Sequence, residues 1–240
     1  MAFKGMLPAL VLALAAVNVS TAAAAPALHI VVYGGSGHIG QRIVHEALSR
    51  GHTLRVVVRE PDSMPAGASA RLSVVKGDVR DVAQAEKLLD GADVVVCAVS
   101  FRKPPDPAGY RAAAAALVTA QRSLGARAPR LIFVGGAGSL EERPGVLVAD
   151  QMPSAFRAEA LGQKAALDYL RGIGDVPWTY FSPAASIAPG ERTGHFRLGG
   201  DQLIRDAHGA SRISMEDYAV AVIDEAEHPV HLHRRFTIGY

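Results

Sequence analysis

One stretch near the start of the chain, residues 28–40, constrains the fold more than any other. It reads LHIVVYGGSGHIG, an apolar and β-branched run that ends in a cluster of glycines. An amphipathic helical pattern follows directly. This order predicts a strand, a tight turn and the N-terminus of a helix. Unpaired amides and a positive helix dipole at such a turn favour binding of an anion, usually a diphosphate.

The glycines of this stretch have a spacing that suits a dinucleotide. Gly34 fits a turn with positive φ, Gly37 leaves room for a phosphate beside the backbone, and Gly40 permits close packing of the helix on the strand. Glycine also marks ordinary turns, but the strand before, the helix after and the next strand beyond favour nucleotide binding. The candidate cofactor-binding residues here are Gly34, Ser36, Gly37, His38, Ile39 and Gly40.

Strands and helices alternate from Leu28 onward, without internal repeats or a low-complexity linker. The pattern predicts strands at 53–58, 72–75, 92–99, 130–134 and 178–181, and helices at 38–50, 82–89, 111–124 and 155–171. It therefore predicts an α/β fold with a doubly wound parallel sheet in residues 28–240. Residues 184–240 are expected to form a smaller mixed lobe that contacts substrate, and the irregular stretch 141–154 a mobile lid.

The ends of the next three predicted strands supply further candidates for the cofactor site. Arg59 follows the second strand, where a carboxylate would select NAD; an arginine can pair with a 2′-phosphate, which favours NADP and leaves NAD as an alternative. A solvated arginine would look the same. Asp78 and Val79 follow the third strand, where the carboxylate would bond adenine or cap a helix. Val99 and Ser100 end the fourth, where ligands lie in open α/β sheets.

Composition excludes several other functions. The formal net charge of the 240 residues is +2, so no broad basic surface is expected and nucleic acid is not a main partner. Cys97 is the single cysteine, which excludes an internal disulfide. Neither it nor the histidines near the C-terminus have partners at ligand spacing, so no metal site is expected. The expected partners are a dinucleotide and a small-molecule substrate; the sequence does not indicate an oligomeric state.

Residues 1–27 resemble a secretory signal peptide. Lys4 supplies a positive start, residues 6–17 are apolar apart from Pro8, and residues 20–25 are small. The apolar run is shorter than the roughly 20 residues of a transmembrane helix, so no stable membrane span is expected after processing. Export to the periplasm follows, although nicotinamide cofactors are mainly cytosolic. A start codon placed too far upstream, which would leave the protein cytoplasmic, or an uncleaved anchor would give the same pattern.

Several motifs taken together resemble a known family. They are the glycine motif at 34–40, Asp78-Val79, the glycine-rich strand end at 135, and residues 178–183, 190–194 and 213–219. The chain is similar to an atypical short-chain dehydrogenase/reductase, closest to the NAD(P)-binding, NmrA-like subgroup that includes flavin and biliverdin-IXβ reductases. The resemblance covers Leu28 to Tyr240 and implies a Rossmann fold, a dinucleotide cofactor and hydride transfer.

The chain departs from that family's pattern at the catalytic pair. Typical members carry Tyr-x-x-x-Lys on the helix after the fifth strand, where the tyrosine donates a proton and the lysine lowers its pKa and holds the ribose. Here Ala160 stands four residues before Lys164, and Ile173 four residues after Tyr169. Lys164 could still hold the ribose, or be a solvated helix residue. The resemblance places the catalytic serine near Ser139, which could equally be a loop or cap residue.

Three functions fit these observations. The first is an enzyme: an NADPH-dependent reductase of a small carbonyl, quinone or flavin-like substrate, with Ser139 or Tyr110 as a polar contact. The second is a non-catalytic, dinucleotide-sensing regulator of the NmrA type, which the missing tyrosine favours. The third is a nucleotide-sugar epimerase, against which the missing Tyr–Lys pair counts heavily. We prefer the enzyme.

Overall fold

An eight-stranded sheet organises the described part of the chain, which in this computed structural model comprises residue 1, residues 26–63 and residues 69–240. The strand order is β10-β12-β8-β5-β4-β1-β2-β3. All neighbours run parallel except β10, which is antiparallel to β12. The predicted α/β fold with a doubly wound parallel sheet is confirmed. Most of the segment predicted as a signal peptide lies outside the described residues.

The main-sheet strands are β1 (His29–Tyr33), β2 (Thr53–Val58), β3 (Leu72–Lys76), β4 (Val94–Cys97), β5 (Arg130–Val134), β8 (Trp178–Ser182), β10 (Arg197–Gly199) and β12 (Arg234–Gly239). The helices are α1 (His38–Ser49), α2 (Val82–Leu89), α3 (Pro107–Leu124), α4 (Ser154–Arg171) and α5 (Met215–Glu227). Short 3₁₀ turns lie at Pro61–Ser63, Gly125–Arg127, Ala137–Ser139 and Val148–Gln151.

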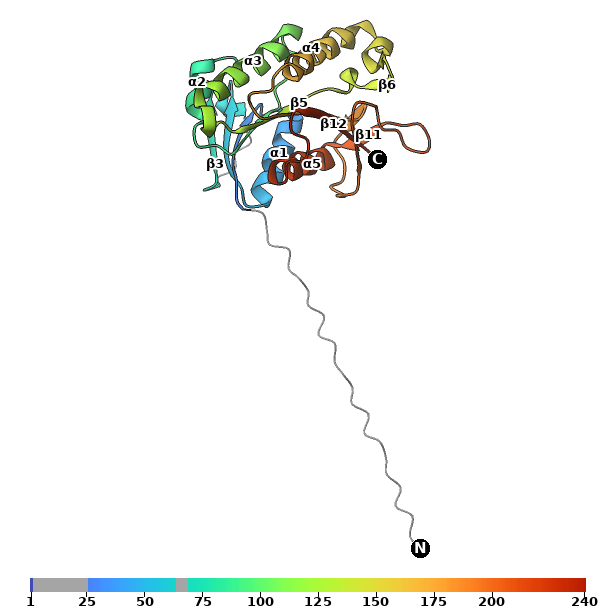
Figure 1. The fold of residues 1–240 in the computed structure, drawn as a ribbon, viewed down its shortest axis with the longest axis horizontal. Coiled ribbons are helices and arrows are strands. Elements are labelled where there is room, and N and C mark those ends of the chain that lie inside the picture. Colours follow the sequence, from blue (N-terminus) through green and yellow to red (C-terminus); the bar gives the residue numbers. More distant parts are fainter. Residues whose placement is uncertain (2–25, 64–68) are drawn as a thin grey trace.

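The helices cover the sheet in two layers (Figure 1). Helices α1 and α5 pack together on one face, where the core includes Ile43 of α1 and Val222 of α5. Helices α2, α3 and α4 cover the other face over a second core. Both faces of the central strands are therefore buried, as the nearly continuous apolar sequence of β4 requires.

Polar residues fix where several helices begin. The side chain of Asp81 accepts a hydrogen bond from the amide of Gln84 at 3.0 Å, and that of Asp106 from the amide of Gly109 at 3.0 Å. Pro107 then occupies the first position of α3, where no amide donor is needed. Helix α3 consequently begins four residues before the predicted Arg111, because Asp106 caps it within the proline-rich loop.

The C-terminal segment predicted as a smaller lobe extends the main domain. Strand β12 adds to β8 in parallel, and β10 closes that edge. Helix α5 joins the α1 layer, while β9 (Ser186–Ala188) and β11 (Arg212–Ser214) form a separate two-stranded sheet. The backbone of β8 needs a partner on its outer side, and β12 supplies it.

The stretch predicted as a lid contains a short hairpin of β6 (Glu141–Arg143) and β7 (Val146–Leu147). The amide of Glu141 donates to the carbonyl of Asp201, and the amide of Leu203 donates back to Glu141, each at 2.9 Å. The hairpin is therefore attached to the segment before β11.

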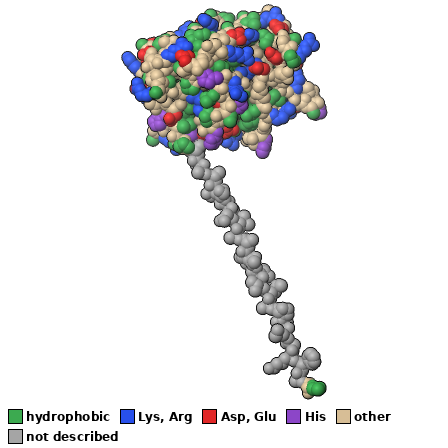
Figure 2. Space-filling model, viewed as in Figure 1, with side chains coloured by type: hydrophobic (Ala, Val, Ile, Leu, Met, Phe, Trp, Pro, Cys, Tyr) green, Lys and Arg blue, Asp and Glu red, His purple; other side chains and the backbone are tan. Residues whose placement is uncertain are grey.

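The surface shows no strong segregation of charge on the face drawn in Figure 2, where basic and acidic side chains are interspersed. Within the described residues, none of the helices combines the length and apolar character needed to cross a membrane.

A buried carboxylate joins α1 to the loop after β9. Glu46 is 3% exposed and accepts hydrogen bonds from Arg50 at 2.8 Å and from Arg192 at 2.7 and 2.8 Å. Arg50 also reaches Asp224 and Glu227 of α5, each at 2.7 Å. The hydrogen bond from Arg192, aided by Arg50, lowers the pKa of Glu46 although burial opposes this.

We expect Glu46→Gln to lower the free energy of unfolding at pH 7 by about 1–3 kcal/mol, since charge-assisted hydrogen bonds to a buried group are lost. A lowered folded-state pKa stabilises the protein above the ordinary glutamate pKa, and this contribution is lost as the pH falls through the folded-state value. The difference between wild type and variant should therefore shrink in acid. Urea unfolding between pH 7 and pH 3 measures it, with Glu191→Gln as the control; an equal effect of both substitutions would contradict the assignment.

Candidate dinucleotide and substrate site

Two adjoining cavities follow the carboxyl ends of β1, β2 and β4. The smaller has a volume of about 180 Å³ and the larger about 860 Å³. Both are lined by Gly37, Arg59, Ala98, Val99 and Ser100. They lie where the strand order reverses between β1 and β4, which is the usual ligand position in open α/β sheets.

Close backbone approach builds the middle of this site. Gly34 has a φ of +80°, and a Cβ there would lie 2.5 Å from the carbonyl oxygen of Ala98. A Cβ on Gly40 would overlap the carbonyl of Gly34, so α1 can lie this near the turn only with glycine at both positions. Gly37, in contrast, is exposed and lines both cavities.

The first turn of α1 offers its amides to the cavities. Gly37 is the N-cap residue, its lack of a side chain leaves the cap position without a side-chain acceptor, and no acidic residue lies in the first turn. Helix N-termini with such amides bind phosphate groups. The donor set and the open space at Gly37 therefore fit the diphosphate of a dinucleotide.

Charged side chains that follow β2 and β3 line the smaller cavity, namely Arg59, Asp78 and Arg80. Asp78 is held by Arg80, which donates from its amide at 2.9 Å and from its guanidinium at 2.9 and 3.1 Å. These hydrogen bonds lower the pKa of Asp78. The guanidinium carbon of Arg80 lies 5.6 Å from the ring centre of Phe101. Arg59 lies at the same cavity and its charge also lowers the pKa of Asp78.

The structure brings the predicted cofactor residues together. Those lining at least one cavity are Gly34, Ser36, Gly37, His38, Ile39, Arg59, Asp78, Val79, Val99 and Ser100. Gly40 lies behind them as a buried packing residue. Tyr33, Arg80 and Phe101 also line the smaller cavity and were not predicted from the sequence as site residues. Arg80 directly follows Asp78-Val79, and that adjacency was the available signal.

The larger cavity extends from this turn to α4. Helix α4 contributes Phe156, Glu159, Ala160 and Gln163, and the segment before α3 contributes Arg102 and Lys103. Apolar residues form much of the remaining wall: Ile39, Met152, Pro153, Pro183, Ala184, Ile187 and Met215. A large and partly apolar cavity with a few convergent polar groups is typical of a small-molecule site.

Tyr110 and Glu159 both line the larger cavity and are hydrogen-bonded to each other. The hydroxyl of Tyr110 donates to Oε1 of Glu159 at 2.8 Å and accepts from the amide of Phe101 at 3.2 Å. Arg102 Nε donates to both carboxylate oxygens of Glu159, at 2.6 and 2.7 Å. Burial is the largest cause that raises the pKa of Tyr110, and the Glu159 carboxylate adds to it. Tyr110 therefore stays a neutral phenol that points its proton at Glu159.

Ser139 lies behind the cavity wall. It is 3% exposed, its hydroxyl donates to the carbonyl of Gly136 at 3.0 Å, and Arg235 of β12 donates to that hydroxyl at 3.4 Å and to the Ser139 carbonyl at 3.1 Å. Neither cavity includes it among its lining residues. This arrangement gives no support to the catalytic role predicted for Ser139. Its side chain is buried and hydrogen-bonded to Arg235, and it does not reach either cavity.

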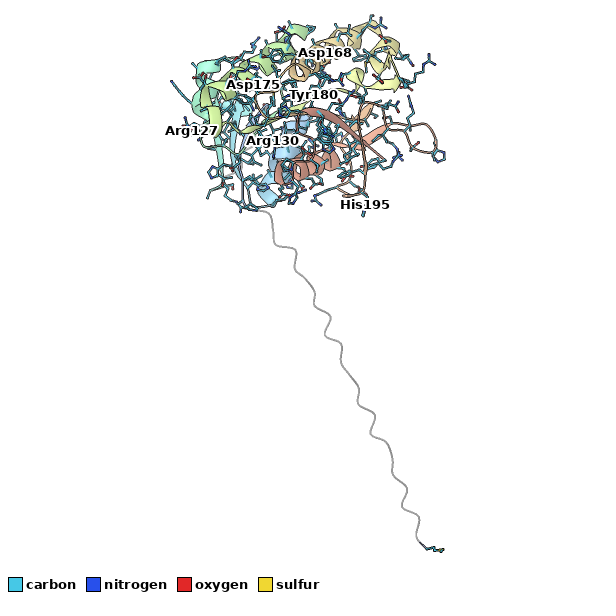
Figure 3. The ribbon with its side chains drawn as sticks, in the orientation of Figure 1. Arg127, Arg130, Asp168, Asp175, Tyr180 and His195 are labelled. Atoms are coloured by element: carbon cyan, nitrogen blue, oxygen red, sulfur yellow. The ribbon has the colours of Figure 1, made fainter. Side chains whose placement is uncertain are left out.

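Lys164 is also turned away from the cavities. Its ammonium group donates to Asp168 at 2.6 Å, one turn further along α4. Asp168 is labelled on α4 in Figure 3. Lys164 is not among the residues of α4 that line the cavities. The structure therefore gives no support to a role of Lys164 in holding a ribose.

Comparison with known proteins gives consistent relatives. A sequence model of the family described as NAD(P)H-binding matches residues 34–228. A Burkholderia pseudomallei protein named "putative exported protein" is 40% identical, with a TM-score of 0.79 over 89% of this chain and 100% of that one. A "putative epimerase" from Bacteroides thetaiotaomicron is 36% identical, with a TM-score of 0.81 over 90% and 98%. A "putative NADH-flavin reductase" from Streptococcus pneumoniae TIGR4 is 29% identical, with a TM-score of 0.75 over 88% and 99%.

We expect Gly37→Ala to weaken NADPH binding by at least about tenfold while the protein stays folded. A Cβ at Gly37 meets only the carbonyl oxygen of Gly34, at 3.3 Å, and otherwise projects into the place predicted for the diphosphate. Gly40→Ala is the matched comparison, because its Cβ collides with backbone and should lower the melting temperature. Fluorescence titration and thermal unfolding separate the two. Unchanged NADPH affinity in Gly37→Ala would place the diphosphate elsewhere.

Proposed function

Because this chain belongs to the NAD(P)H-binding family, as an atypical short-chain dehydrogenase/reductase with a Rossmann fold, we propose that it is an NADPH-dependent reductase. Its proposed substrate is a small carbonyl, quinone or flavin-like compound. The family relation makes it an NAD(P)-binding, oxidoreductase-type protein with a nicotinamide dinucleotide as cofactor and a small-molecule ligand. The preference for NADPH, the substrate class and turnover itself belong to the proposal.

One observation supports the proposal most directly: two cavities adjoin at the first turn of α1. Both are lined by Gly37, Arg59, Val99 and Ser100. A dinucleotide laid with its diphosphate at Gly37 would direct its base toward Asp78 and its nicotinamide toward the larger cavity. When bound in this way, a reduced nicotinamide would supply a hydride to a substrate held beside α4.

The chain's own residues have distinct tasks in this arrangement. The amides of α1 bind the diphosphate, Arg59 pairs with a 2′-phosphate, and Arg80 orients Asp78 toward the adenine side. The apolar wall around Phe156 and Met215 displaces water from the substrate. The putative NADH-flavin reductase from Streptococcus supports the reductase assignment, and the putative epimerase from Bacteroides keeps an isomerase as a lesser alternative.

We expect the wild-type protein to oxidise NADPH with at least one acceptor from a panel of aldehydes, quinones and flavins. The Kd for NADPH should be lower than the Kd for NADH. Arg59→Gln should raise the Kd for NADPH by roughly 10- to 150-fold, which corresponds to about 1.5–3 kcal/mol, because a charge-assisted phosphate contact is lost. NADH affinity should hardly change. Arg234→Gln, at the exposed start of β12, is the control.

Equal affinity for both cofactors, or an unaltered NADPH affinity in Arg59→Gln, would overturn the NADP assignment. Tight NADPH binding without turnover of any acceptor would favour the dinucleotide-sensing regulator instead. The two results are independent, since one reports on the 2′-phosphate and the other on hydride transfer.

We also propose that residues 1–27 direct export and are then removed. The signal-like sequence is one support, and the 40% identical Burkholderia protein named for export is the other. N-terminal sequencing of the protein from the periplasm of its native cell should begin after the small residues at 20–25. An intact Met1 in a cytosolic fraction would reject export.

A further inference from the structure

Of the two positions on α4 that correspond to the family's Tyr–Lys pair, only the first meets the larger cavity. Positions four residues apart lie on one face of a helix. Ala160 lines the cavity, but Lys164 turns to Asp168. The polar pair with this spacing that faces the cavity is Glu159 and Gln163. A carboxylate therefore lies in the substrate cavity, one position before the alanine.

Glu159 is held there by three other side chains. Tyr110 donates to it from α3 at 2.8 Å, Arg102 from the loop before α3 at 2.6 and 2.7 Å, and Gln163 from the next turn of α4 at 3.4 Å. The Glu159 side chain is 18% exposed. A carboxylate fixed in this manner at the edge of a cavity can exchange protons both with a bound substrate and with water.

The other titratable groups lining the larger cavity are less suited to proton transfer. Arg59 and Arg102 stay charged at all ordinary pH values. Tyr110 has a raised pKa and its proton already points at Glu159. His38 lies in the first turn of α1, where the diphosphate is expected. Lys103 is exposed on the proline-rich loop.

We propose that Glu159 is the proton-transfer residue of this protein's reaction and that Tyr110 is its positioning residue. The inference rests on the proposed reductase function. The Glu159 carboxylate would first take up a proton from water. A hydride supplied by a bound reduced nicotinamide would then add to the carbonyl carbon, the π-electron pair of the C=O bond would move to oxygen, and that oxygen would take the proton from the Glu159 carboxyl group. The products are an alcohol, oxidised dinucleotide and the Glu159 carboxylate, which water reprotonates. Alcohol oxidation runs the same steps in reverse, with the carboxylate as base.

The first test compares two kinds of acceptor in wild type and Glu159→Gln. One is the aldehyde or quinone that the wild type reduces fastest, which needs a proton; the other is the 10-methylacridinium cation, which takes a hydride alone. We expect kcat for the first to fall about 10²- to 10⁴-fold, the usual range for a lost acid–base group. Turnover of the acridinium and Kd for NADPH should stay within about threefold. Glu86→Gln on α2, whose carboxylate accepts from Ser123, is the control.

The second test separates a positioning role of Tyr110 from a structural one. Tyr110→Phe removes one of the hydrogen bonds that hold Glu159, so kcat for the aldehyde or quinone should fall, but by less than in Glu159→Gln. KM for that acceptor and turnover of the acridinium should stay within about threefold, because substrate binding and hydride transfer are untouched. A loss of acridinium turnover in Tyr110→Phe would make Tyr110 a structural residue.

Three results would overturn the inference. The first is an active wild type whose Glu159→Gln variant reduces carbonyls equally well, which would leave the reductase function intact. The second is an equal loss with both acceptors, which would make Glu159 a structural residue. The third is a wild type that binds NADPH and reduces no acceptor, which would remove the proposed function and the inference together.

Discussion

The site depends on how closely the N-terminus of α1 approaches the turn after β1. That approach is possible because Gly34 and Gly40 have no Cβ, so backbone meets backbone and the carbonyl of Ala98 can lie against the turn. The first-turn amides then face the two cavities. A side chain at either position would push backbone atoms apart at this turn and would change the walls of the two adjoining cavities.

A second constraint connects the two halves of the site. The loop between β4 and α3 supplies Phe101 to the smaller cavity and Arg102 to the larger one. The ring of Phe101 meets Tyr110 edge to face, with ring centres 5.0 Å apart, and its amide donates to the Tyr110 hydroxyl. Arg102 and Tyr110 both bond Glu159. The smaller and the larger cavity are thus connected by a few contacts around one short loop.

The sequence predicted the parts of this structure that depend on local pattern. The strand–glycine–helix order indicated the turn beside which the two cavities lie, and the strand ends indicated Arg59, Asp78, Val99 and Ser100, which line them. Predictions lost support where the surroundings of a side chain depend on a residue far away in the sequence. Ser139 is buried, and Arg235, from a strand near the end of the chain, donates hydrogen bonds to its carbonyl and hydroxyl oxygens. No local signal shows that pairing.

Which face of α4 meets the larger cavity likewise depends on tertiary packing. A search for Tyr-x-x-x-Lys in the sequence leads to Ala160 and Lys164, and only the packed helix shows that the polar residues at the cavity are Glu159 and Gln163. The pairing of Glu159 with Tyr110 joins two helices and could not be read from either alone. The position of β12 beside β8 likewise depends on which sheet edge was left open.

The proposed function requires a diphosphate at the first turn of α1, and a crystal structure of the protein with NADPH tests this most directly. We predict diphosphate oxygens within hydrogen-bond distance of the amides of His38 and Ile39, with the 2′-phosphate near Arg59 and the nicotinamide in the larger cavity toward Glu159. A dinucleotide bound elsewhere, with that turn in contact only with water, would contradict it.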